Sequence, residues 1–131
     1  MDLIADTTFL IGIWRNQSWA ENFAEQNDSQ IFGIPWVTLG EFWQGAVRSN
    51  HDREEVEDFL SLGAPIWNTE PIVSVYAKMC ARLQEQKHYG GIAQNDLWIA
   101  ATAIAFDKPL VTRNRRHFDK IEDLKLEILA E

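Results

Sequence analysis

Hydrophobic and polar residues follow two different patterns along this chain. Apolar runs of two to four residues are typical of buried strands, and the longer segments between them repeat their apolar positions every three or four residues, as packed helices do. The short runs predict strands at 3–5, 31–34, 66–67, 110–112 and 126–129. The longer segments predict helices around 9–14, 19–23, 38–47, 52–62, 71–88 and 97–106, with a turn over 114–121.

Strands that alternate with helices form right-handed βαβ units, which place the strands parallel in one sheet and the helices on its two faces. A length of 131 residues is typical of one domain, and the sequence contains no linker, internal repeat or low-complexity stretch. We therefore expect a single α/β domain over 1–131. Its central sheet should be mostly parallel, with four or five strands and helices on both faces.

The charge of the chain is negative and unevenly distributed. The net charge is -8, from 20 acidic and 12 basic side chains. Residues 1–70 carry twelve acidic and three basic side chains, whereas 71–131 carry eight acidic and nine basic ones, including Arg113, Arg115 and Arg116. This balance excludes a basic coat for nucleic acid, and the hydrophobic content of 46% excludes a disordered chain.

Several simple features indicate the cellular compartment. The sequence has no apolar run of 18 residues, so we expect no membrane span and no membrane partner. Its first residues include two acids and no positive segment, which differs from a secretory signal. Cys80 is the only cysteine, and its apolar neighbours predict a buried thiol rather than a reactive one. A cytoplasmic protein is the expectation.

Four polar residues stand where predicted strands and helices meet. Asp6 directly follows the first strand, and Asn114 follows the fourth strand by two residues. Glu41 lies early in the helix after the second strand, and Asp96 begins the helix before the fourth. In open α/β sheets the ligand crevice lies beyond the carboxyl ends of the strands, so these four side chains are candidates for one site.

Helix capping could also explain some of these residues. Asp6 and Asn95 are good N-cap types, and Thr38 to Glu41 matches the capping-box pattern Ser/Thr-x-x-Glu. Asp96 is harder to explain in this way, because Asn95 already supplies a cap. Three carboxylates at one sheet edge would repel one another unless a cation lay between them.

Four segments together resemble the PIN-domain ribonucleases, and within them the VapC-like toxins of toxin–antitoxin pairs. The segments are 4–8, 38–42, 95–103 and 110–118, in family order and at family spacing. The most specific part is the pattern Asn-Asp-x-x-Ile-Ala-Ala from Asn95, followed by Thr-x-Asn-x-x-x-Phe from Thr112.

The resemblance implies a metal site and its residues. Asp6, Glu41 and Asp96 would hold Mg²⁺ or Mn²⁺, with Asn114 at a fourth position that is Asp or Asn in the family. Because Asn114 is uncharged, the site has one negative charge fewer to bind a second cation than it would have with an Asp at this position. Beside the site, Thr7 and Thr112 would orient ligands or bound waters. His117 would either contact RNA or pack.

The resemblance also implies an activity and partners. The chain would be a divalent-metal-dependent endoribonuclease that hydrolyses RNA phosphodiester bonds, with an antitoxin protein as partner and a homodimer as its assembly. Phosphodiester hydrolysis needs an activated water and stabilised charge, which cations held by carboxylates supply. The neighbouring Arg113, Arg115 and Arg116 would contact the RNA backbone. A catalytically inactive PIN-like module that binds RNA or protein is the second possibility.

Two unrelated activities and a base-stacking surface have less support in the sequence. A metal-free ribonuclease would need a pair of histidines, and His51, His88 and His117 are far apart along the chain. A phosphoacceptor receiver domain would need a Lys after a late strand, where this chain has an Arg and an Asn. Six tryptophans could stack on bases, but Trp14 and Trp43 lie within apolar helical faces and are expected in the core or at an interface.

Overall fold

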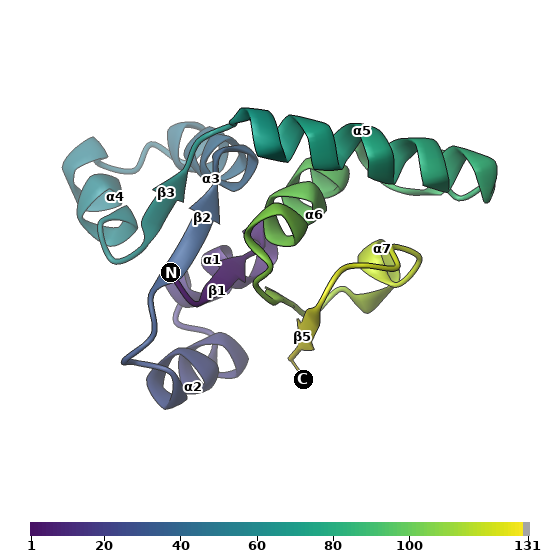
Figure 1. Cartoon of the computed structure of the whole chain (residues 1–131). Helices are drawn as coiled ribbons and strands as arrows, with labels where there is room; N and C mark the ends of the chain where they lie inside the picture. The colour runs from purple at the N-terminus through teal and green to yellow at the C-terminus, as the bar shows by residue number, and fades with distance from the viewer. Residues whose placement is uncertain (130–131) are drawn as a thin grey trace.

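A computed structural model describes residues 1–129, so the last two residues of the predicted 1–131 domain lie outside it. Strands and helices alternate along the chain (Figure 1). The strands are β1 (Leu3–Ala5), β2 (Phe32–Pro35), β3 (Ala64–Ile66), β4 (Leu110–Thr112) and β5 (Leu126–Ile128). The helices are α1 (Thr7–Trp14), α2 (Ser18–Gln26), α3 (Trp36–Arg48), α4 (Arg53–Leu60), α5 (Glu70–Glu85), α6 (Gln94–Phe106) and α7 (Arg115–Phe118), with a 3₁₀ turn at Tyr89–Gly91.

The five strands form one sheet in the order β3-β2-β1-β4-β5, and every neighbouring pair is parallel. This confirms the expected parallel α/β fold. From β1 the chain moves outward to β2 and β3, and then crosses back to β4 and β5 on the other side of β1. The strand order therefore reverses between β1 and β4, and in open parallel sheets ligands bind at such a point.

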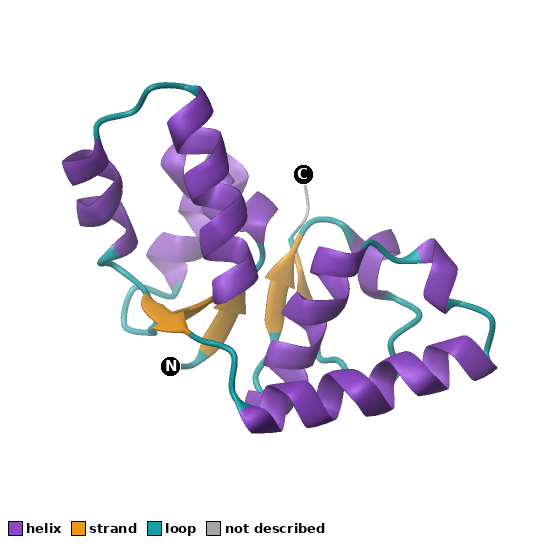
Figure 2. Ribbon diagram, turned by 90° about the horizontal axis from the view of Figure 1, so that it is seen from above, coloured by secondary structure: helices purple, strands orange, loops and turns teal. Residues whose placement is uncertain are grey.

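Alternate residues of the central strand face two different cores. Ile4 packs with α5 and α6 on one face, while its neighbours Leu3 and Ala5 pack with α1 and α2 on the other. Side chains of a strand point alternately to opposite faces, so an apolar run of three buries both sides. Figure 2 shows the helices on the two sides of the strands.

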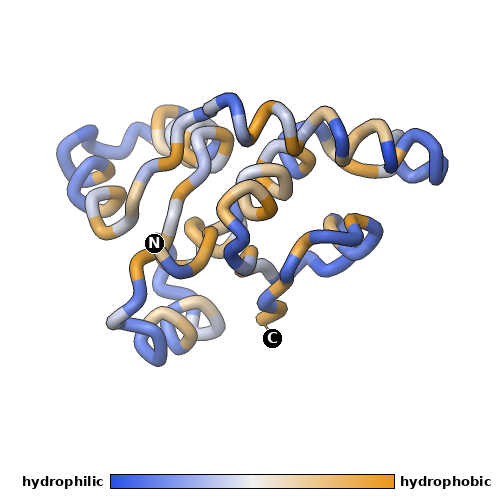
Figure 3. Tube along the Cα trace, viewed as in Figure 1, coloured by the Kyte–Doolittle hydropathy of each residue, from blue (hydrophilic) through white to orange (hydrophobic). Residues whose placement is uncertain are grey.

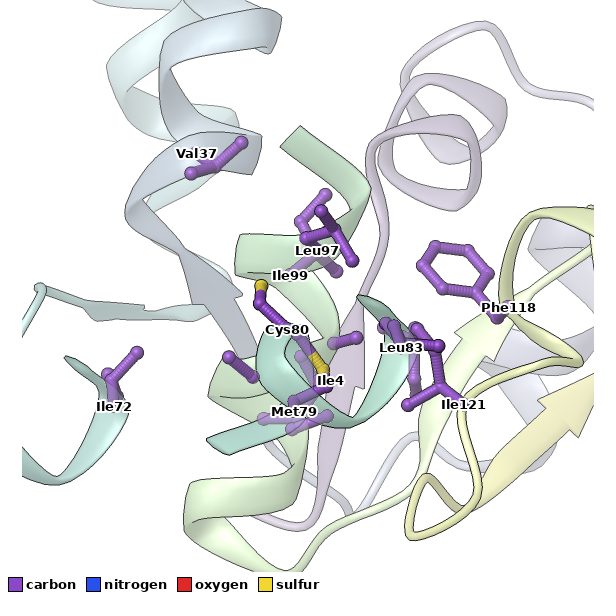
Figure 4. Close-up of a cluster of buried hydrophobic side chains, with 14 of the residues drawn as sticks. Ile4, Val37, Ile72, Met79, Cys80, Leu83, Leu97, Ile99, Phe118 and Ile121 are labelled. Carbon is purple, nitrogen blue, oxygen red and sulfur yellow. The ribbon is translucent and has the colours of Figure 1, made fainter. Parts of the chain in front are cut away.

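The larger core lies beneath α5 and α6. Met79, Cys80 and Leu83 of α5 lie near Ile4 and Ile99 in this core (Figure 4). Cys80 is buried, which confirms the predicted buried thiol, and burial raises the pKa of that thiol. Hydrophobic and hydrophilic colours alternate along the helices, whereas α4 and the far end of α5 are mainly hydrophilic (Figure 3).

Aromatic side chains fill the cores of the N-terminal half. Phe9 is fully buried, with its ring centroid 5.2 Å from that of Phe32 and 5.8 Å from that of Phe23. Trp14 is half-buried and meets Phe42 and Phe59 edge to face, which fits the predicted place in the core or at an interface. No helix within residues 1–129 is long and apolar enough to span a membrane.

Several predicted boundaries were wrong by one or more residues. The third strand is Ala64–Ile66 and excludes Trp67, whose side chain is exposed. Helix α5 ends at Glu85 rather than at 88, and the predicted turn over 114–121 contains α7. Ends are the weakest part of a periodic pattern, because terminal residues contribute few apolar positions to it.

Two predicted caps are also absent. Helix α3 begins at Trp36, so Thr38 and Glu41 lie inside the helix and form no capping box. Helix α6 begins at Gln94 with Ala93 at the N-cap position, which places Asn95 within its first turn. In contrast, Asp6 does cap α1, because its carboxylate accepts a hydrogen bond from the backbone N–H of Phe9.

Candidate active site

The carboxyl ends of β1 and β4 open into a cavity of about 480 Å³ at the point where the strand order reverses. All four residues predicted for the metal site line this cavity, although they come from different elements. Its lining residues are Asp6, Thr7, Thr8, Glu41, Ala93, Gln94, Asn95, Asp96, Asn114, His117 and Phe118. Tertiary structure thus brings together predicted ligands that are up to 108 positions apart.

Asp6 is the most deeply buried acid of this cavity, with only 3% of its surface exposed. It caps α1 through the N–H of Phe9 at 2.7 Å, and the hydroxyl of Thr112 also donates to it. Burial nevertheless raises the pKa of Asp6 to about 6, and the negative charge of Asp96 adds to this rise. The side chain of Asp6 therefore both caps α1 and lines the cavity.

Glu41 reaches the cavity from α3 and is held there by α1. The Thr7 hydroxyl donates to Glu41 Oε1 at 2.6 Å, which fixes one carboxylate oxygen. Thr38, one turn earlier in α3, lies with its hydroxyl 3.4 Å from the carbonyl oxygen of Ala5. The segment that resembled a capping box thus ties α3 to the end of β1 and the start of α1.

Asp96 lies in the first turn of α6, where the helix dipole favours a negative charge. Its Oδ2 atom is 3.2 Å from Nδ1 of His117, which joins α6 to α7. Burial raises the pKa of Asp96, and the charge of Glu41 raises it further, whereas His117 lowers it. His117 therefore faces the cavity and pairs with a predicted ligand, and it is 55% exposed.

Asn114 connects the end of β4 to the start of α1. Its side-chain amide donates to the Thr8 hydroxyl at 3.0 Å, and its backbone N–H donates to the Thr112 hydroxyl at 3.0 Å. Because Thr112 also contacts Asp6, a chain of hydrogen bonds runs from Asn114 to the buried carboxylate. Thr7 thus lines the cavity and Thr112 contacts the predicted ligand Asp6, so both lie beside the predicted site.

The three arginines predicted to bind RNA do not line the cavity. The guanidinium of Arg113 lies over the ring of Trp19, 4.4 Å from its centroid. This cation–π contact joins the end of β4 to α2. Arg115 and Arg116 lie on α7 with exposed side chains. Of the three arginines, Arg115 and Arg116 are exposed to solvent, whereas Arg113 is half-buried.

The donor set of the cavity suits a hard divalent cation. Three carboxylates and one amide provide oxygen atoms, which Mg²⁺ and Mn²⁺ prefer. Burial is the main cause of the raised pKa values of Asp6 and Asp96, and the neighbouring carboxylates raise them further. Within residues 1–129, however, no group of three His, Cys, Asp or Glu side chains could hold a metal as it stands. Each carboxylate instead engages an internal hydrogen-bond partner or His117.

Sequence reasoning missed two partners of the predicted residues. The Thr8 hydroxyl accepts a hydrogen bond from Asn114, and the Thr38 hydroxyl contacts the carbonyl oxygen of Ala5 at the end of β1. In the sequence, both threonines were indistinguishable from ordinary residues at the start of a helix. The pairing of His117 with Asp96 was also unforeseen, since the two residues are 21 positions apart. The only signal in the sequence was that each of these residues belongs to one of the four matching segments.

Comparison with known proteins gives a consistent assignment. A family model described as PIN domain matches residues 3–124. Ribonuclease VapC1 of Methanocaldococcus jannaschii is 29% identical over 127 residues, covering 96% of this chain and 85% of the relative. Ribonuclease VapC of Rickettsia bellii is 29% identical over 132 residues, covering 96% and 95%.

A solved structure shares the whole fold. The crystal structure of VapBC2 from Rickettsia felis, bound to a DNA fragment from its promoter, superposes with a TM-score of 0.84 at 26% identity, covering 99% of this chain and 100% of that one. Together with the family match over nearly the whole chain, this confirms the resemblance inferred from the four segments. The chain belongs to the PIN-domain family.

Proposed function

We propose that this chain is a divalent-metal-dependent endoribonuclease that acts as the toxin of a toxin–antitoxin pair. The observation that carries the proposal is the convergence of Asp6, Glu41 and Asp96, from three different elements, on one cavity at the reversal of strand order. The names of the relatives support it, since two are ribonucleases called VapC and one solved neighbour is a VapBC assembly.

The acidic side chains would act together on the metal. Asp6, Glu41 and Asp96 would hold Mg²⁺ or Mn²⁺, and Asn114 would support them. When bound, the cation supplies a water of lowered pKa and neutralises the charge that develops on the phosphate. Thr7 and Thr112 would keep Glu41 and Asp6 in place through the hydrogen bonds that they make to them.

RNA would approach the cavity past exposed positive charge. Arg115 and Arg116 lie on α7, whose neighbour His117 already faces the cavity, so their guanidinium groups suit the RNA backbone beside the cleavage site. Arg113 would serve mainly to hold this turn against Trp19. The protein would act in the cytoplasm, where its RNA substrates are found.

The decisive experiment measures RNA cleavage by wild type and by Asp96→Asn with Mg²⁺ or Mn²⁺ and with EDTA. We expect cleavage by wild type only, with metal only, and a loss of at least roughly 100-fold in the variant because a charged ligand is removed. Asp119→Asn, which neutralises an exposed acid outside the cavity, is the matched control and should cleave normally. Equal cleavage by wild type and Asp96→Asn would refute this mechanism.

The second candidate function, an inactive PIN-like binding module, predicts a different result. Neither protein would cleave RNA, while RNA or protein binding would persist in both. Toxicity gives an independent test. Expression without an antitoxin should arrest growth, and Asp6→Ala should relieve the arrest. If Asp6→Ala arrested growth as strongly as wild type, the toxicity would not come from this cavity.

The expected partners can be tested separately. The likeness to the VapBC2 structure supports an antitoxin partner, which would bind and silence this protein. A homodimer is also expected, because aromatic side chains are abundant for so small a chain. Light scattering of the purified chain should give twice the mass of 15.1 kDa, and a mass of one chain would refute the dimer.

A further inference from the structure

A second groove adjoins the carboxylate cavity. It has a volume of about 290 Å³ and lies between α1 and the C-terminal half of α3. Its lining residues are Ile11, Trp14, Arg15, Glu41, Phe42, Gly45, Ala46, Arg48, Ser49 and His51. Glu41 lines both this groove and the carboxylate cavity, so the two are neighbours on either side of one predicted metal ligand.

The charge of this groove differs from that of its surroundings. Residues 1–70 contain only three basic side chains, Arg15, Arg48 and Arg53. Two of the three line the groove, where Glu41 is the single acid among the described lining residues. A region that is strongly acidic overall thus places two of its three basic side chains in one groove, next to the proposed site of cleavage.

The two arginines of the groove differ from Arg53 in their partners. Arg53 forms an ion pair with Glu57 at 2.7 Å and lies over the ring of Trp43. In the part of the chain that the structure describes, neither Arg15 nor Arg48 makes a side-chain hydrogen bond or ion pair. Both side chains are exposed, and their donors are therefore available to a ligand.

Helix capping explains part of this arrangement but not all of it. Arg15 is the C-cap of α1 and Arg48 is the last residue of α3, positions where the helix dipole favours a cation. The dipole accounts for the residue type at each helix end. It does not require the two ends to meet in one groove, nor the groove to adjoin the carboxylates.

We propose that this groove is a subsite for single-stranded RNA, in which Arg15 and Arg48 contact backbone phosphates away from the scissile bond. The inference rests on the proposed ribonuclease function. An RNA strand that is cut in the carboxylate cavity must continue beyond it, and the groove offers the adjoining positive surface. Trp14 and His51 also line the groove, with perpendicular rings whose centroids are 5.2 Å apart, and a base can pack against one of these rings.

The subsite makes a prediction about RNA length. A short RNA occupies only the carboxylate cavity, whereas a longer one also reaches the groove. Two lengths of one RNA that wild type cleaves, of about 4 and about 12 nucleotides, span the range of typical single-strand sites. We expect Arg15→Gln/Arg48→Gln to raise KM for the long RNA by roughly 10-fold or more with kcat unchanged, because binding away from the reacting phosphate is lost uniformly. The short RNA should be cleaved as by wild type.

Salt dependence provides a second readout. Each phosphate contact contributes about 0.7 to the slope of log affinity against log salt for single strands, so losing two contacts should make this slope shallower by about 1.4. Arg53→Gln removes the remaining arginine of the same half, outside the groove, and should leave KM and the slope unchanged. Urea unfolding of all variants checks that the folds are intact.

The results separate this inference from the proposed function. If the double variant had the same KM and salt slope as wild type, the proposed subsite would be refuted. The proposed ribonuclease function would still stand. Normal cleavage combined with loss of binding to the antitoxin would also overturn it, in favour of a protein-docking groove. If wild type cleaved no RNA, the proposed function would fail. Fluorescence anisotropy of the long RNA in an Asp96→Asn background would then still test whether Arg15 and Arg48 bind it.

Discussion

Replacing Asp6 by Asn should stabilise the metal-free protein at neutral pH, although it removes a predicted ligand. Asp6 is almost fully buried, and the nearby charge of Asp96 adds to the cost of ionising it. The N–H of Phe9 and the hydroxyl of Thr112 offset only part of this cost. Asn has a similar shape and can still accept the capping hydrogen bond of Phe9, but it carries no charge.

The magnitude follows from the pKa of Asp6. Its pKa is raised from 3.8 to about 6, which corresponds to about 3 kcal/mol in the free energy of unfolding. Because the folded state keeps its proton to higher pH than the unfolded state, this stability is present below pH 3.8 and is lost as pH rises through about 6. The buried NH₂ group of Asn costs about 1–2 kcal/mol, so a net gain of about 1–2 kcal/mol should remain at neutral pH.

Urea unfolding in EDTA at pH of about 4.5 and about 7.5 measures the effect. The difference in unfolding free energy between Asp6→Asn and wild type should increase by about 2 kcal/mol between these pH values, since most of the ionisation of folded Asp6 falls in this window. Subtracting wild type from the variant removes the contributions of other titrating groups. A difference that did not change with pH would refute the reasoning about burial and charge.

Two further predictions concern packing and metal. Gly12→Ala should destabilise the protein by about 1–3 kcal/mol in urea unfolding, because the new Cβ would lie 2.6 Å from a ring atom of Trp19. Gly40→Ala, with no atom within 4 Å, should instead stabilise by about 0.5–1 kcal/mol, and the same sign for both would contradict this view of the α1–α2 contact. Saturating Mn²⁺ should raise the Tm of wild type by on the order of 5 °C but leave that of Asp6→Asn almost unchanged, and equal shifts would place the metal elsewhere.

Local patterns in the sequence were sufficient for the fold class. The buried triplets at 3–5 and 110–112 and the helical spacing between strands predicted parallel βαβ units, because each element must bury an apolar face against its neighbours. They were also sufficient for the candidate residues. Asp6, Asp96 and Asn114 stand at element ends, Glu41 lies inside α3, and all four line one cavity.

Element boundaries and caps were less predictable. The pattern Thr-x-x-Glu predicted a capping box at Thr38, yet α3 begins at Trp36 and both side chains bond to other elements. A local motif specifies only which hydrogen bonds are possible. Which of them form depends on partners such as Thr7 and Ala5, which are more than 30 positions away.

By itself, then, the sequence determined a parallel α/β domain and the residue types of an acidic site, because periodic apolar burial and residues at element ends are local properties. Only the tertiary structure decided that β1 and β4 adjoin, that His117 pairs with Asp96, and that Arg113 lies on Trp19 rather than in the cavity. It also decided that Arg15 and Arg48, two of the three basic residues of the N-terminal half, line a groove with Glu41. These are long-range contacts, and they depend on how whole elements pack rather than on any short segment.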